Sequence, residues 1–331
     1  MVALTRKTID GLWKEIALYD HLKMRRATEG ILAISRRLNR NARLPTLDAW
    51  LLVFDQFVFW YAALATILFA SDPRRLPGER CDEWRACTSL LCAIVSNLLA
   101  IRQLVVSGFD VAAKQLTRSL CEYADLLNLI VLKPSLATDF INLEDQDERN
   151  KFWWKHVKKA RKIVHDYLAT LGEVGEYEAI DAWRQQEDTL LSMAAHPSFI
   201  ASFAAAVPSE FRGLGYFGQR TTASNRTVHY AISALCDFLL VGLHVPFEHG
   251  RGVPPLLKFN RRDPLHQYVK NGRIVLSALV RYIDVNHDSI ELDPRAPRTK
   301  KGALMIIRRT TKKMPSPDKV WEQLRTRVTR A

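Results

Sequence analysis

The chain has 331 residues, of which 48% are apolar and 25% charged, a composition that is typical of a folded globular protein and excludes a disordered or low-complexity chain. Its net charge of +13 is concentrated at the two ends: residues 294–331 carry +10 and residues 23–43 carry +6, which leaves −3 for the rest. Such basic segments attract phosphate-rich or acidic partners, although Lys/Arg-rich ends also serve simply to keep a protein soluble.

The cysteines and the start of the chain predict a compartment. The five cysteines show no CxxC spacing, and several lie in apolar helical segments, where cysteine behaves as a small hydrophobic residue. The first residues, MVALTRKTIDGLWKE, are charged and contain no apolar signal segment. We therefore expect a cytoplasmic protein. No P-loop, GxGxxG, GxSxG or HExxH motif is present, so we expect no cofactor and no metal.

Helical periodicity runs through almost every long segment, and the breaks fall at proline and glycine. Helices are predicted over residues 5–39, 47–70, 82–106, 109–132, 148–171, 176–196, 224–245, 264–286 and 316–328. This pattern predicts an all-α protein, an irregular bundle of about eight to ten helices. We expect one helical domain over residues 1–293, formed by a basic N-terminal segment (1–45) and a core bundle (46–293). A basic C-terminal tail (294–331) with a short terminal helix follows.

Three segments are apolar enough to raise the question of a membrane, namely 51–70, 90–106 and 230–245. Each contains a polar or charged group near its middle, such as Asp55, Arg102 or Asp237, which would be costly in lipid. We therefore expect these segments to be core helices, with no membrane contact.

The segment 109–132 presents one continuous polar stripe, because its polar residues follow one another at spacings of four and three. These residues are Lys114, Arg118, Glu122, Asp125 and Asn128. Two interpretations are open. The stripe is either the solvated face of the helix, or it faces an internal cavity in which Arg118 pairs with Glu122 and marks a site.

A second candidate lies in TLLSMAAHPSF, residues 189–199. His196 stands at the C-terminal end of the predicted helix, where the helix dipole favours a protonated imidazole, and Pro197 ends the helix. One interpretation is a simple structural stop. The other is a polar edge formed by Ser192, His196 and Ser198 in an otherwise apolar segment.

The motifs RSLCEYADLL, KPSLATDF and LSMAAHPSF resemble those of a loosely characterised group of bacterial helical proteins with an RxxxE helix and an LSxxxHxS element. The resemblance covers residues 95–245 and is carried by these short motifs. Such proteins are often grouped with HEPN-like helical domains, some of which are metal-independent ribonucleases in toxin and phage-defence systems. The resemblance implies that Arg118, Glu122, Ser192 and His196 are the site residues.

The HEPN nuclease motif itself, an arginine followed by a histidine after four to six residues, occurs as Arg261/His266 and as Arg281/His287. Chance alone predicts about as many matches, so these pairs carry no weight. If the second were functional, Arg281 would stabilise phosphate charge and His287 would act as a general acid or base.

Two further patterns are weaker. Arg226 and His229 lie on the first turns of a predicted helix, whose positive end would accept a phosphate, although solubility and capping explain them equally well. In FWWKHVKKARKIVH, Trp153 and Trp154 alternate with lysines, and we expect the tryptophans to pack while the lysines are solvated.

Together these features predict a bacterial effector or accessory protein of a defence or toxin type. Its catalytic pocket would consist of Arg118, Glu122 and His196, with Lys114, Ser192, Ser198, Arg226 and His229 as binding residues. The expected ligand is RNA or a nucleotide, contacted also by the basic segments. The alternative is a non-enzymatic scaffold whose basic tail docks an acidic protein partner; a homodimer is compatible with either.

Overall fold

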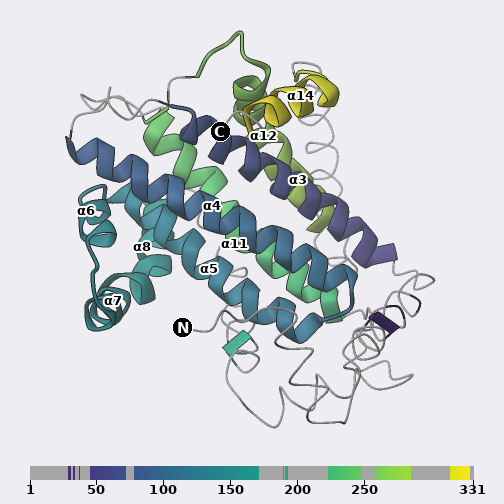
Figure 1. Ribbon diagram of the computed structural model, residues 1–331, viewed down its shortest axis with the longest axis horizontal. Helices are drawn as coiled ribbons and strands as arrows, with labels where there is room; N and C mark the ends of the chain where they lie inside the picture. Colours follow the sequence, from purple (N-terminus) through teal and green to yellow (C-terminus); the bar gives the residue numbers. More distant parts are fainter. Residues whose placement is uncertain are drawn as a thin grey trace, which may run out of the picture.

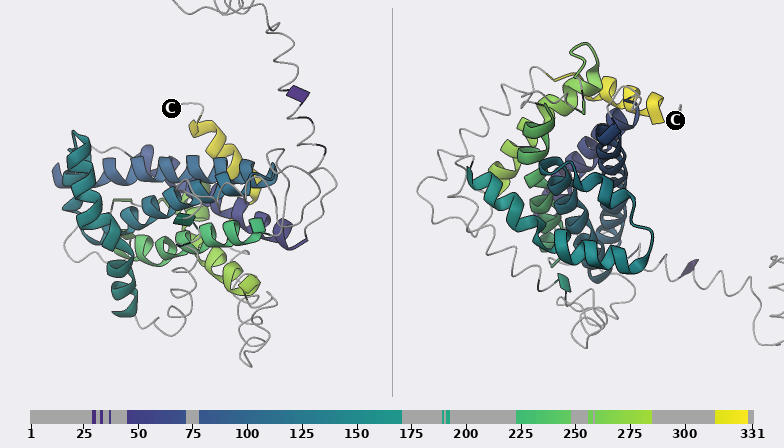
Figure 2. Two further views of the ribbon diagram at one scale, coloured as in Figure 1. Left: turned by 90° about the horizontal axis from the view of Figure 1, so that it is seen from below. Right: turned by 90° about the vertical axis from the view of Figure 1, so that its left-hand side faces the viewer.

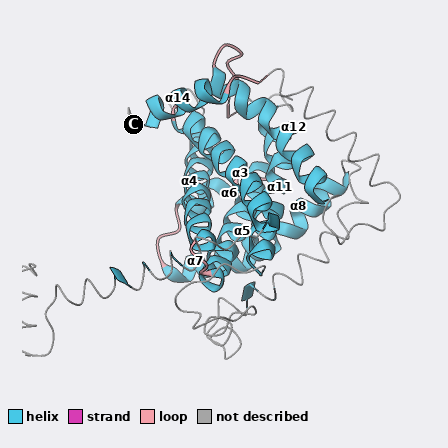
Figure 3. Ribbon diagram, turned by 90° about the vertical axis from the view of Figure 1, so that its right-hand side faces the viewer, coloured by secondary structure: helices cyan, strands magenta, loops and turns pink. Residues whose placement is uncertain are grey.

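The computed structural model describes residues 45–71, 78–170, 223–247, 256–257, 259–284 and 314–328, together with the single positions 29, 30, 33, 37, 189, 191 and 192. Within these ranges all regular secondary structure is helical and no strand occurs (Figure 3). The predicted all-α, multi-helix fold is therefore confirmed.

The helices follow one another with short connections over much of the chain. They are α3 (Pro45–Phe69), α4 (Gly78–Val106), α5 (Asp110–Leu132), α6 (Leu136–Ile141), α7 (Gln146–Phe152), the π-helical turn η2 (Trp153–Val157), α8 (Lys158–Thr170), α11 (Ala223–Phe247), α12 (Pro264–Asp284) and α14 (Pro317–Val328). Helix α7 thus begins two residues before the predicted helix over 148–171, inside the acidic segment EDQDERN.

Helix α5 packs against α4, α11 and α8 (Figure 1). Helix α3 packs against α4, α11 and α12, and α14 packs against α12 and α3. The shorter elements α6 to α8 close one end of the bundle, as the side views also show (Figure 2). Most of α5 therefore lies against other helices, although Gln115 and Ser119 are exposed, and this helix is the natural place for a site.

The turn from α4 into α5 depends on Gly108. Its φ of 80° lies in the left-handed region that favours glycine. Phe109 N donates to Leu104 O at 2.8 Å and Gly108 N donates to Val105 O at 3.0 Å, which is a Schellman-type helix end. This tight end allows α5 to fold back along α4 after only three residues.

The core contains large aromatic side chains whose polar atoms are satisfied by distant helices. Trp60 and Tyr61 are both 0% exposed. Trp60 Nε1 donates to Val269 O at 2.9 Å, and the Tyr61 hydroxyl donates to Leu235 O at 2.9 Å. Burial raises the pKa of Tyr61, so this phenol remains a neutral donor. These bonds tie α3 to α12 and to α11.

The contact between α3 and α12 requires a glycine. A Cβ atom on Gly272 would lie 2.9 Å from Trp60 Cδ1. We expect Gly272→Ala to destabilise the protein by about 1–2 kcal/mol, because overpacking costs more than the improved helix propensity returns. Urea unfolding checks this. The control is Gly30→Ala, since no atom lies within 4 Å of that position, and an equal loss in both variants would contradict the packing argument.

Two described helical segments, Trp50–Phe69 and Arg80–Val106, are long and apolar enough to span a membrane by length and composition. Their mean hydropathies are 1.8 and 1.9, and 61% and 33% of their most apolar windows are buried inside the protein. Across these two helices Arg102 Nη2 donates to Asp55 Oδ2 at 2.9 Å, and Arg102 Nε donates to Asp55 Oδ1. The charges that we noted in the sequence are therefore paired with each other.

Several predicted elements lie outside the described residues. They are the helices predicted at 5–39 and 176–196, apart from single positions. The predicted start of the helix near residue 224 needs a correction. Helix α11 begins at Ala223, and the hydroxyl of the buried Ser224 has no hydrogen-bond partner within the part of the chain that the structure describes.

Candidate functional site

The polar stripe of α5 is not a solvated face. It passes from half-buried at Lys114, Arg118 and Glu122 to buried at Asp125 and Asn128. From Ala124 to Val131 every residue of the helix is buried. The stripe therefore runs from an accessible region into the interior, and Arg118 lies in its accessible half.

Arg118 joins two segments that are far apart in the chain. Its Nη1 donates to Ser192 Oγ at 2.8 Å, and its Nε donates to Glu122 Oε1 at 3.4 Å. We call Arg118, Glu122 and Ser192 the Arg118 cluster. The side chains of Arg118 and Glu122 are 30% and 39% exposed, so the cluster is accessible to a ligand. Three of the four residues that the family resemblance indicated thus lie together.

One turn earlier on α5, Lys114 is already neutralised. Its Nζ lies 2.7 Å from Asp110 Oδ2, and Asp110 Oδ1 accepts a hydrogen bond from Thr227 Oγ1 at 2.8 Å. This chain of contacts links the start of α5 to the start of α11. Lys114 was predicted as a binding residue, but its ammonium serves as the partner of a neighbouring carboxylate.

One turn beyond the Arg118 cluster, Asp125 takes part in a separate contact with α8 and α11. Arg161 Nη2 lies 3.7 Å from Asp125 Oδ2 and donates to the Tyr230 hydroxyl at 3.2 Å. Asn128 follows at 0% exposed, and neither of its amide atoms has a hydrogen-bond partner in the described part of the chain. This end of the stripe holds three helices together.

The predicted phosphate site at the start of α11 is not supported by the geometry there. The ring of His229 stacks on Trp50, with centroids 4.4 Å apart and an interplanar angle of 23°. Arg226 is exposed on the helix surface. The hydroxyl of the neighbouring Thr227 already donates a hydrogen bond to the Asp110 carboxylate. His229 therefore packs against α3, and a carboxylate stands where an anionic ligand was expected.

Of the remaining predicted residues, the structure describes only some. His196, Ser198 and His287 lie outside the described residues, as does the side chain of Arg281. In the other chance motif, His266 Nδ1 accepts from Asn260 N at 3.2 Å and its Nε2 lies 3.8 Å from Asp263. Burial lowers the pKa of His266, while Asp263 acts in the opposite direction. His266 is thus engaged in a local turn before α12.

The described residues offer neither a metal-binding group nor an activated cysteine. Among the described residues there is no group of three or more His, Cys, Asp or Glu side chains arranged to hold a metal ion. All five cysteines are free thiols. Burial raises the pKa of Cys87, beside the Glu83 carboxylate, and it also raises that of Cys92. Neither thiol is therefore activated as a nucleophile.

Sequence reasoning missed one surface. We expected both tryptophans of FWWKHV to pack, but Trp154 is 59% exposed, whereas Trp153 is half-buried against the core. The cause is the π-helical turn η2, which changes the direction in which successive side chains point relative to the core. The signal in the sequence was the five-residue spacing of the apolar Phe152 and Val157, which a regular α-helix does not place on one face.

The relation of this chain to known proteins was sought in three ways. A scan against protein-family models, a search of curated proteins and a search of solved structures found no match. The Arg118 cluster is therefore interpreted from its own geometry.

Proposed function

We propose that this protein binds a phosphate-bearing ribonucleotide, either RNA or a free nucleotide, at the Arg118 cluster. In this proposal it acts as a cytoplasmic bacterial effector or accessory protein of a defence or toxin type. The observation that carries the proposal is the guanidinium of Arg118, which is accessible, held in place by Ser192, and only partly used.

The donor count of Arg118 supports a further ligand. A guanidinium has five N–H donors in a rigid fork that matches the oxygens of a phosphate group. Only the bonds to Ser192 and Glu122 engage Arg118 within the described part of the chain, so three donors remain. The 3.4 Å contact with Glu122 is long for a charged hydrogen bond, so a phosphate would compete well for this side of the guanidinium.

The proposal also gives roles to the neighbouring residues. The Ser192 hydroxyl holds the guanidinium in one orientation, and it would also donate to a bound phosphate oxygen. His196 follows Ser192 by four residues, one helical turn in a continuous helix, so the imidazole would stand on the same edge and serve as a proton donor to the phosphate. Cleavage of RNA would require this histidine, whereas binding alone would not.

Binding of AMP, compared with adenosine, tests the proposal. We expect Arg118→Gln to weaken AMP binding by about 10- to 100-fold, because one charged hydrogen-bonding group is lost. Adenosine affinity should not change, since adenosine has no phosphate. Glu122→Gln should strengthen AMP binding, because the competing carboxylate is removed. Isothermal titration calorimetry measures these affinities, namely those of the wild type and both variants for AMP and those of the wild type and Arg118→Gln for adenosine.

The matched control is Arg325→Gln. Arg325 also pairs with a glutamate on its own helix, Glu322 at 2.9 Å, but it lies on α14. Equal AMP affinities for the wild type, Arg118→Gln and Arg325→Gln would refute the site. A second assay separates binding from catalysis: total cellular RNA is incubated with the wild type, Arg118→Ala and His196→Ala. Cleavage by the wild type alone would assign a ribonuclease activity, and intact RNA in all three would restrict the site to binding.

A further inference from the structure

The corner formed by α7, η2 and α8 has a geometry that pushes one tryptophan outward. Phe152, Val157 and Ala160 are all buried, at spacings of five and three residues. The π-helical turn accommodates the five-residue step, so that both Phe152 and Val157 face the core. Trp154 lies between them on the outer side. Single π-helical turns of this kind occur frequently at functional sites.

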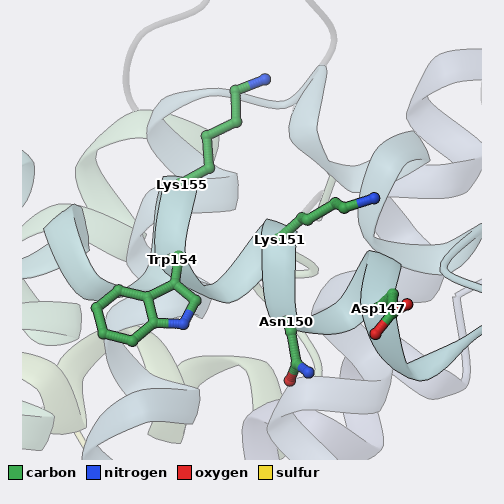
Figure 4. A pocket seen from close by; sticks show the side chains of 5 residues that line it. All are labelled: Asp147, Asn150, Lys151, Trp154 and Lys155. Atoms are coloured by element: carbon green, nitrogen blue, oxygen red, sulfur yellow. The ribbon is translucent and has the colours of Figure 1, made fainter.

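Trp154 lies at an open hollow on this corner. The hollow has a volume of about 730 Å³ and is lined by Asp147, Asn150, Lys151, Trp154 and Lys155 (Figure 4). The indole also carries a cation over one face: Lys158 Nζ lies 4.1 Å from the ring centroid. An indole of which 59% is exposed offers a flat apolar surface that water solvates poorly.

Five lysines lie on the same segment as this indole. They are Lys151, Lys155, Lys158, Lys159 and Lys162, and all five are exposed. None of them forms an ion pair in the described ranges, whereas Arg80, Arg102, Lys114, Arg118, Arg161 and Arg327 all do. Lys151 precedes the π-helical turn, Lys155 lies within it, and Lys158 and Lys162 follow it one turn apart on α8. We call these four lysines and Trp154 the lysine–tryptophan surface.

The positive charge of this surface affects the pKa of the neighbouring His156. The pKa of His156 is lowered by burial and then by Lys155, with further lowering by Lys133 and Lys159, while Asp139 raises it. The lysines therefore contribute a positive potential at His156, which Asp139 partly offsets. A polyanion that lies along the surface would neutralise this potential.

Two features favour a nucleic acid over an anionic membrane. Trp154 is the only strongly exposed large apolar side chain on residues 146–170, and a single indole gives little area for insertion into lipid. Asp147 and Asn150 also line the hollow, and the Asp147 carboxylate would repel a lipid phosphate there. Next to a stacked base, however, they supply hydrogen-bonding groups for its edge.

We propose that the lysine–tryptophan surface binds single-stranded nucleic acid, with one base stacked on Trp154 and successive phosphates contacted by Lys151, Lys155 and Lys162. Aromatic stacking combined with a basic track is the general mode by which single strands are bound without sequence preference. The surface shares no residue with the Arg118 cluster, and the proposal does not depend on ligand binding there.

Fluorescence anisotropy with a labelled dodecamer of uridine tests the charges. Between about 50 and 200 mM salt, the triple variant Lys151→Gln, Lys155→Gln, Lys162→Gln should show a salt slope that is smaller by about 2, because each phosphate contact of a single strand contributes about 0.7. The matched control removes three exposed cations elsewhere, in Arg262→Gln, Lys270→Gln, Lys319→Gln. An equal change of slope in both triple variants would overturn the proposal.

Trp154→Ala tests the stacking. It should weaken binding of the dodecamer by about 5- to 100-fold without a change in salt slope, because a base loses its stacking partner but no charge is removed. The control is Trp321→Ala, which removes an indole that is 52% exposed on α14. Far-UV circular dichroism verifies that each variant is folded.

Two results would overturn the proposal in favour of another partner. One is equal binding of the dodecamer by Trp154→Ala and Trp321→Ala. The other is Trp154-dependent binding to phosphatidylserine vesicles, with no binding of the dodecamer. Because Arg118 is intact in all these variants, loss of AMP binding by Arg118→Gln and loss of RNA binding by the surface variants are separate outcomes.

Discussion

Replacing Trp60 by alanine is expected to lower the free energy of unfolding by about 3–5 kcal/mol, the range for removal of a fully buried large aromatic side chain. Trp60 is 0% exposed and packs edge-on against Tyr61, at a centroid distance of 5.0 Å. Its Nε1 also donates to Val269 O on α12. The substitution would leave a cavity between α3 and α12 and would remove the hydrogen bond that joins these helices. Urea denaturation followed by far-UV circular dichroism measures the loss.

The same substitution at an exposed indole is the control. Trp154→Ala is expected to change the free energy of unfolding by about 0.5 kcal/mol or less, because that side chain is 59% exposed. Trp60→Phe separates packing from hydrogen bonding, since it retains most of the ring and removes the donor, and its cost should lie between the two. If Trp60→Ala and Trp154→Ala were equally destabilising, the assignment of Trp60 to the core would be wrong.

Glu83 is expected to make the protein less stable as the pH rises from about 4.5 to about 7. Burial raises the pKa of this carboxyl from 4.5 to about 7, although the nearby Arg80 acts in the opposite direction. The Arg80 Nη1 atom lies 2.7 Å from Glu83 Oε2, but the orientation is not that of a hydrogen bond. In the folded state Glu83 retains a proton that the unfolded state releases at lower pH. The contribution of Glu83 to stability is therefore fully present below pH 4.5 and is lost as the pH rises to about 7.

The difference between the wild type and Glu83→Gln measures this effect. The amide is neutral at every pH, so the two proteins should be about equally stable at pH 4.5 or below. Above pH 7 the variant should be more stable by roughly 2–3 kcal/mol, since 2.5 pKa units correspond to about 3 kcal/mol. Taking the difference cancels the opposite contributions of His156 and His266, whose pKa values are lowered. A difference that does not vary with pH would show that Glu83 ionises normally in the folded protein.

The helices were predictable because their signals are local. Apolar periodicity indicated α3, α4, α5, α8, α11 and α12, and proline or glycine marked most of their ends. The start of α7 was missed because the acidic segment before it reads as a turn. In the structure, Asp145 caps this helix by accepting from Glu148 N at 2.8 Å. A side-chain cap thus converts a polar segment into the first turn of a helix.

The candidate site was predictable only in part. The spacing of Arg118 and Glu122 on one helix requires that they be neighbours, because residues four apart share a face. The contact of Arg118 with Ser192 spans 74 positions of the chain, and no local rule predicts it. Likewise, the stacking of His229 on Trp50 results from how α11 packs on α3, which overrides the local expectation of a free helix start.

The lysine–tryptophan surface shows why regular periodicity misleads at an irregular turn. With 3.6 residues per turn, Trp153 and Trp154 both appear able to pack along the helix, and the lysines appear to be an ordinary solvated face. At the π-helical turn of residues 153–157 the two indoles pack edge to face, with centroids 5.1 Å apart. One of them is nevertheless half-buried, and the other is exposed beside lysines that form no ion pair within the described ranges. Only the structure reveals this combination.

The central claim is that the guanidinium of Arg118 contacts a phosphate of a bound ribonucleotide. The most direct measurement is the NMR signal of its Nε–H group in protein labelled at arginine with ¹⁵N, assigned by its loss in Arg118→Gln. The account predicts a saturable shift of this signal on addition of AMP, and no comparable shift with adenosine. An unchanged Arg118 signal at saturating AMP, or an equal shift with adenosine, would contradict it.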